Sequence, residues 1–146
     1  MLANDDHILA TSVAGGDGLG TLFDLTGSQT GWSQRVLYRF YGDPDGGEPV
    51  GKLASDAAGT IFGATTIGGT DNAGAVFELE KSKTGWRDKV LHSFTAGSDG
   101  YLPYAGVTSD GGGHLFGTTL FGGGGKGGCG SESCGTVYEI TVKQER

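Results

Sequence analysis

The stretch Gly59-Thr-Ile-Phe-Gly-Ala-Thr-Thr-Ile-Gly-Gly69 decides the fold, because it returns 54 positions later as Gly113-His-Leu-Phe-Gly-Thr-Thr-Leu-Phe-Gly-Gly123. The same offset relates further pairs of motifs: Gly20-Thr-Leu-Phe23 and Gly74-Ala-Val-Phe77, Thr30-Gly-Trp32 and Thr84-Gly-Trp86, Val36-Leu37 with Phe40 and Val90-Leu91 with Phe94. Roughly two-fifths of the aligned positions are identical. Self-similarity at a fixed period of this length is the sequence signature of a repeat architecture.

The pattern extends towards both ends of the chain. Gly135-Thr-Val-Tyr138 restarts the unit after a longer loop, and residues 7–15 align as a degraded copy of residues 61–69. We therefore expect a single repeat domain over residues 1–146. It divides into a partial unit at 7–49, a full unit at 50–95 and a partial unit at 104–141.

Each unit contains four segments that are typical of short β-strands. β-branched and aromatic residues gather in these segments, and Asp and Gly residues, which tolerate turn backbones, separate them. The expected strands are residues 36–41, 50–55, 60–66, 74–80, 90–95, 104–109 and 114–120. Val76 and Phe77 are adjacent apolar residues, which predicts that their strand is buried on both faces. The segments at Gly31-Trp32 and Gly85-Trp86 are expected to turn the chain.

Four short antiparallel strands that recur in tandem are typical of a β-propeller blade, so the sequence predicts an all-β partial propeller of about two and a half blades. A β-sandwich is the second interpretation. A closed propeller has roughly 4–8 blades. The units would therefore close as a homo-oligomeric ring, belong to a longer array, or fold as a sandwich.

The composition excludes several classes of protein. Glycine accounts for 31 of 146 residues without a period of three, which excludes collagen and indicates many tight turns. A formal net charge of −7 without a basic cluster argues against nucleic acid as a partner. No run of 18 apolar residues is present, so we expect no membrane insertion. The first residues show no signal peptide.

The combination of Gly-Thr-Val-Phe-like, Val-Leu-x-x-Phe, Asp-Gly-x-x-Pro and Gly-x-Leu-Phe-Gly-Thr-Thr-x-x-Gly-Gly motifs resembles the GloVer-type tandem repeat, from about His7 to Thr141. This resemblance implies a bacterial protein that is secreted or displayed at the cell surface. The family pattern includes no catalytic residue and no cofactor, so none is transferred to this chain.

Recurring aromatic residues are expected to pack between neighbouring units: Phe23 and Phe77, Trp32 and Trp86, Phe40 and Phe94, Phe62 and Phe116. The alternative for Trp32 and Trp86 is an exposed platform on which sugars stack. His92, which replaces Tyr38 of the preceding unit, joins Asp45 and Asp99 as a further ligand-binding candidate.

The recurring aspartates have two interpretations. Asp45 and Asp99 precede glycines and Asp56 and Asp110 begin turns, so each carboxylate is expected to accept hydrogen bonds from nearby backbone amides. The alternative is a calcium site, for which Asp43 and Asp45 are the candidates.

Cys129 and Cys134 are the two cysteines of the chain, and both lie in the longer loop. The sequence predicts a local disulfide that closes this loop, with two reduced thiols as the alternative.

Taken together, these features predict a non-catalytic repeat module that forms a binding or structural surface, with carbohydrate or a cell-surface polymer as the ligand class. The alternatives are a carbohydrate-active enzyme with its site at the propeller axis and a pure self-assembly module. The expected protein partner is a second copy of the chain or the remainder of a longer array.

Overall fold

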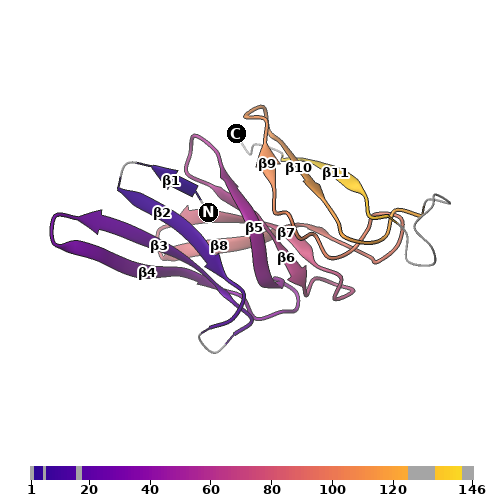
Figure 1. The fold of residues 1–146 in the computed structure, drawn as a ribbon, viewed down its shortest axis with the longest axis horizontal. Coiled ribbons are helices and arrows are strands. Elements are labelled where there is room, and N and C mark those ends of the chain that lie inside the picture. Colours follow the sequence, from indigo (N-terminus) through magenta and orange to yellow (C-terminus); the bar gives the residue numbers. More distant parts are fainter. Residues whose placement is uncertain (1, 5, 16–17, 125–133, 143–146) are drawn as a thin grey trace.

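The computed structural model describes residues 2–4, 6–15, 18–124 and 134–142, and within these ranges it contains strands and no helix. The strands form three open antiparallel sheets, each with its strands in chain order (Figure 1). The first sheet comprises β1 (Leu2–Asn4), β2 (His7–Ser12), β3 (Thr21–Ser28) and β4 (Gly31–Arg39). The prediction of an all-β protein is therefore confirmed.

The second and third sheets follow the same order of strands. The second comprises β5 (Gly47–Ser55), β6 (Ile61–Ile67), β7 (Ala75–Ser82) and β8 (Gly85–Ser93). The third comprises β9 (Thr108–Ser109), β10 (His114–Thr118) and β11 (Val137–Thr141). Among the described residues, no fourth strand pairs with β11.

The turn predicted at Gly31-Trp32 and Gly85-Trp86 is wrong, because these residues begin strands β4 and β8. The chain reverses two residues earlier, where Ser28 pairs with Gly31 and Ser82 with Gly85. In each hairpin the serine hydroxyl donates to the carbonyl of the glycine, over 2.9 Å in the first and 3.0 Å in the second. These side-chain bonds close the two turns.

The strand registers define which residues are counterparts in successive sheets. Gly63 pairs with Phe77 and Gly117 with Tyr138, which makes Tyr138 the counterpart of Phe77. In the first sheet Ala10, and not Leu9, pairs with Phe23. The alignment of residues 7–15 with 61–69 is therefore displaced by one position, and Ile8 is the counterpart of Ile61.

Two apolar cores hold the three sheets together, and the second sheet lies between the other two (Figure 1). In the first interface, residues of the first sheet pack on the second: Leu22, Phe40, Leu53, Ile61, Phe77 and Leu79. In the second interface, residues of the second sheet pack on the third: Ala54, Phe62, Ala64, Ala73, Val76, Phe94, Val107 and Leu115. Strands β6 and β7 are consequently buried on both faces, as the adjacent Val76 and Phe77 predicted.

Both interfaces use the same positions of the repeat. Leu22, Phe40, Leu53 and Ile61 of the first interface have as counterparts Val76, Phe94, Val107 and Leu115 of the second. The aromatic contacts also recur: Phe40 lies 5.0 Å from Phe77, and Phe94 lies 5.1 Å from Tyr138, between ring centroids. One mode of packing therefore joins each sheet to the next.

We call the side of a sheet that is turned to the next sheet its forward face, and the opposite side its rear face. The forward face of the third sheet is uncovered: Phe116 is 38% exposed, whereas its counterpart Phe62 is 3% exposed. Val137 is 76% exposed, whereas its counterpart Val76 is fully buried. At this position, the predicted packing of aromatic residues between units is therefore found only where another sheet covers the forward face.

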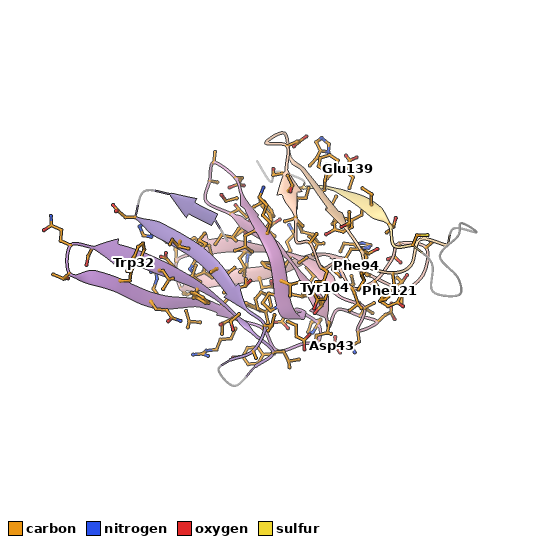
Figure 2. All side chains as sticks on the ribbon, viewed as in Figure 1. Trp32, Asp43, Phe94, Tyr104, Phe121 and Glu139 are labelled. Carbon is orange, nitrogen blue, oxygen red and sulfur yellow. The ribbon has the colours of Figure 1, made fainter. Side chains whose placement is uncertain are left out.

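The rear face of the first sheet is the other uncovered face. Trp32 on this face is 62% exposed and lies over Gly27. Its counterpart Trp86 is partly buried against the first interface. Figure 2 shows Trp32 at the left, on the first sheet, and Glu139 at the upper right, on the third sheet.

Candidate binding cleft between the second and third sheets

Two residues selected from the sequence, His92 and Asp99, meet beside the second interface. Nε2 of His92 lies 3.2 Å from Oδ2 of Asp99. The backbone amide and hydroxyl of Thr95 also donate to the Asp99 carboxylate. Partial burial opposes ionisation of Asp99, but the hydrogen bonds from Thr95 and His92 outweigh it and lower the pKa. This carboxylate therefore fastens the turn that follows β8.

A cleft of about 340 Å³ opens next to this pair. One wall comes from β8 and the following turn and contains His92, Phe94, Ser98 and Asp99. The other wall is formed by residues 136–140, which are Thr136 and the first four residues of β11. Because no described strand pairs with the far edge of β11, the cleft lies along an open sheet edge.

Two neighbouring side chains of β11 point to opposite faces of the third sheet, and only that of Tyr138 faces the second sheet. Burial raises the pKa of Tyr138, so its hydroxyl remains neutral, and it donates to the carbonyl of Gly106 over 3.4 Å. Glu139 is 54% exposed, and its Oε1 lies 2.9 Å from Nδ1 of His114. The cleft thus combines an apolar floor from Phe94 and Tyr138 with the polar side chains of His92 and Asp99. The Glu139 side chain lies on the opposite, forward face of the third sheet.

The pair of His114 and Glu139 has a counterpart in the first sheet. Nδ1 of His7 lies 3.0 Å from Oδ1 of Asp24, which is buried under the second sheet and also meets Arg35 at 3.4 Å. In the second sheet Glu78 takes this position and pairs with Lys89 at 3.5 Å. Each sheet therefore carries an acidic residue at this position of its forward face, with a basic partner on the same sheet.

Asp45, the counterpart of Asp99, is largely buried and is not among the residues that line this cleft. It accepts a hydrogen bond of 2.8 Å from the hydroxyl of Tyr38 and one of 3.4 Å from the amide of Tyr41. Asp88 lies nearby on the rear face of the second sheet, since it pairs with Leu79. Burial, and then the charges of Asp45 and Glu78, raise the pKa of Asp88 to about 7.

The two tryptophans occupy different surroundings. Trp86 lines a second cleft of about 350 Å³ together with Arg35, Leu37 and Lys81. Trp32 lies on the uncovered rear face and reaches neither cleft. The proposed pair of sugar-stacking tryptophans is thus divided between an interface and an open face.

The turn interpretation of the aspartates matches their hydrogen bonds. Asp56 accepts from the amides of Ala58 and Thr60, both over 2.9 Å, and Asp110 accepts from Gly112 and His114. Within the described residues, no group of three or more His, Cys, Asp and Glu side chains is arranged to hold a metal ion. Calcium at Asp43 and Asp45 stays a prediction. Cys129 lies outside the described residues, so its disulfide with Cys134 also stays a prediction.

Sequence reasoning missed Ser98, Tyr138 and Glu139 as cleft residues. The signal that could have found the last two was their position in the restarted unit, at the counterparts of Phe77 and Glu78. Ser98 carries no such signal, because its counterpart in the preceding unit is Pro44.

The comparison with known families gives one match. The family model described as the Gloeobacter/Verrucomicrobia repeat matches residues 1–146. No curated protein and no solved structure matches the chain. The described part of the chain has no helix that is long and apolar enough to cross a membrane.

Proposed function

Because the chain belongs to the Gloeobacter/Verrucomicrobia repeat family, we propose that it is a non-catalytic, propeller-like repeat module that provides a structural surface. Its sheets stack in series as blades, and the surface grows by one blade with each unit. In repeat proteins of this kind, stability comes from each unit and from its contacts with its neighbours.

The observation that carries this proposal is the identity of the two interfaces. Phe40 and Phe94 are both fully buried, and each lies in the core that joins its sheet to the next. In a serial stack, an inner sheet must be covered by neighbouring sheets on both of its faces. The second sheet is covered in this way, because β6 and β7 are buried on both faces.

The acidic side chains in the cleft between the second and third sheets and on the forward faces of the sheets fit a structural role. Asp99 is used to fasten the turn after β8, and Asp24 and Glu78 are engaged by basic residues of their own sheets. A residue in general acid–base catalysis has to exchange protons with a substrate. These carboxylates instead hold neighbouring strands and turns in place.

A pair of matched substitutions tests the stacking role. Phe62→Ala removes a side chain buried under the third sheet, and the unfolding free energy should fall by about 3–5 kcal/mol. Phe116→Ala changes the counterpart on the uncovered face, and the fall should stay within about 1 kcal/mol. Both are measured by urea denaturation at low protein concentration. Equal effects of the two substitutions would contradict stacking through this position.

A second candidate function is ligand binding in the cleft between the second and third sheets. The observation that favours it is the meeting of His92 and Asp99 with Phe94 and Tyr138 around one cleft of about 340 Å³. Carbohydrate or a cell-surface polymer is the proposed ligand class, because an aromatic floor with a polar rim suits sugar rings.

A glycan array tests the second candidate, followed by a reducing-sugar assay on every glycan that binds. Ser98→Phe should fill the cleft and abolish binding, while Lys83→Phe, in an exposed turn, serves as the control. Binding without turnover supports a binding module. Turnover would instead favour a carbohydrate-active enzyme, and an array without any bound glycan would remove the ligand proposal.

The proposed location is outside the cytoplasm, at the cell surface or in the medium. It is supported by the resemblance to repeat proteins of that kind, and it suits a surface module. Fractionation of the native cells with an antibody to the chain tests it, and recovery in the cytoplasmic fraction alone would contradict it.

A further inference from the structure

The two uncovered faces of the molecule carry residues at the same repeat positions as the two faces that pack together in its internal interfaces. The rear face of the first sheet carries Ile8, Phe23, Leu25, Trp32 and Val36. Their counterparts on the second sheet are Ile61, Phe77 and Leu79, which are buried in the first interface, together with Trp86, which packs against it, and Val90. The chain therefore displays one half of an interface that it also forms internally.

The forward face of the third sheet supplies the other half. Phe116, Val137 and Glu139 are the counterparts of Phe62, Val76 and Glu78, all of which the third sheet covers on the second. A forward face and a rear face of the same repeat thus remain open on the two outer sheets of one chain (Figure 1). Complementary halves at opposite ends of a molecule produce head-to-tail association.

Charge at the open faces is compatible with their contact. In the first interface, Asp88 lies on a rear face near the acidic Asp45 of the preceding unit, and both carboxylates carry an oxygen without a hydrogen-bond partner. On the open rear face its counterpart is the neutral Gln34. On the open forward face Oε1 of Glu139 lies 2.9 Å from Nδ1 of His114, so this carboxylate already has a partner on its own sheet.

We infer that two copies of this chain associate head to tail, with the forward face of each third sheet covered by the rear face of the partner's first sheet. Because the described residues of each copy form three sheets, two copies bring six, which lies within the range of roughly 4–8 blades at which propellers close. Both contacts then form in one particle. This inference rests on the stacking role proposed above and names the partner of the open faces.

The test measures particle mass by light scattering on the full chain, with three variants. Val137→Glu and Val36→Glu each place a charge on one open face, at side chains that are already exposed, so folding should be retained. Tyr41→Glu changes a residue that is 62% exposed and lies outside the strands, and it serves as the control. The native protein and the control should be two-copy particles, and either face variant should associate at least about tenfold more weakly.

Mixing the two face variants identifies the geometry. One copy of each variant can still form one unaltered head-to-tail contact, so the mixture should regain association that neither variant shows alone. A two-copy particle that resists Val36→Glu, or a mixture without recovery, would overturn the head-to-tail arrangement. Open-ended polymers would overturn closure, and a monomer at all concentrations would overturn the association itself. If Phe62→Ala still destabilises such a monomer, the stacking proposal stands and the inference alone fails.

Discussion

The hydroxyl of Tyr38 donates a hydrogen bond of 2.8 Å to the carboxylate of Asp45, seven residues later in the chain. Asp45 is 9% exposed, and its other oxygen has no hydrogen-bond partner in the described structure. Burial, and then this bond, raise the pKa of Tyr38 well above its ordinary range. The bond therefore connects the end of β4 to the loop that leads into the second sheet.

Removal of this hydroxyl should destabilise the protein. Tyr38→Phe leaves a nearly buried carboxylate with only the weaker bond from the amide of Tyr41, so the unfolding free energy should fall by about 1–3 kcal/mol. Urea denaturation measures the change. His92→Phe is the matched control at the counterpart position, and its effect should be smaller because Asp99 keeps two bonds from Thr95. A larger loss in His92→Phe would contradict this explanation.

Stability should depend on the ionisation of Asp88. Its pKa in the folded protein is raised to about 7, from an ordinary value of 3.8, by burial and by Asp45 and Glu78. Between these two values the folded state binds a proton that the unfolded state has released, so stability falls as the pH rises from about 4 to about 7. After allowance for solvent screening, the fall should be about 1–2 kcal/mol.

Asp88→Asn isolates this contribution, because all other titrating groups are shared with the native protein. The melting temperatures of the two proteins should be similar near pH 4.5 and should separate towards pH 8, where the variant should be the more stable. Glu78, whose pKa is also raised by burial, leaves a residual slope of the same sign in both proteins. Parallel curves over the whole range would exclude the assigned role of Asp88.

Gly63 should tolerate no side chain. A Cβ atom at this position would overlap the ring of Phe77 and lie 2.8 Å from a methyl carbon of Leu53, both in the first interface. Gly63→Ala should therefore reduce the unfolding free energy by about 1–3 kcal/mol. The control is Ala10→Gly, because Ala10 is the counterpart of Gly63 on the uncovered rear face and already carries a Cβ atom there. Calorimetry compares the two, and a stable Gly63→Ala protein would show that the interface is looser than described.

Most strands and the buried aromatic residues could be predicted from the sequence, because both follow from local patterns. Of the strand expected at residues 104–109, only Thr108–Ser109 forms. Phe77 and Phe94 lie in apolar segments at a fixed period, and the structure buries both completely. The placement of Trp32 could not be predicted in this way. Its position depends on a two-residue turn between Ser28 and Gly31, which the Ser28 hydroxyl closes. From the sequence alone, a turn that contains Gly31 itself fits equally well.

The candidate cleft was predictable only in part. His92 and Asp99 lie seven residues apart, and their contact follows from one turn. Tyr138 reaches the same cleft through the register of β11 against β10 and the packing of the third sheet on the second. Such long-range placement depends on how sheets stack, which a pattern within one unit does not specify.

The sharing of one set of positions by both interfaces has an evolutionary consequence. An in-frame duplication of one unit would bring a forward and a rear face that already fit their new neighbours, so no compensating substitution is required at the junction. A deletion of one unit would rejoin complementary faces in the same manner. The length of such a gene can therefore change in single recombination steps, while selection acts separately on the loops that differ between units.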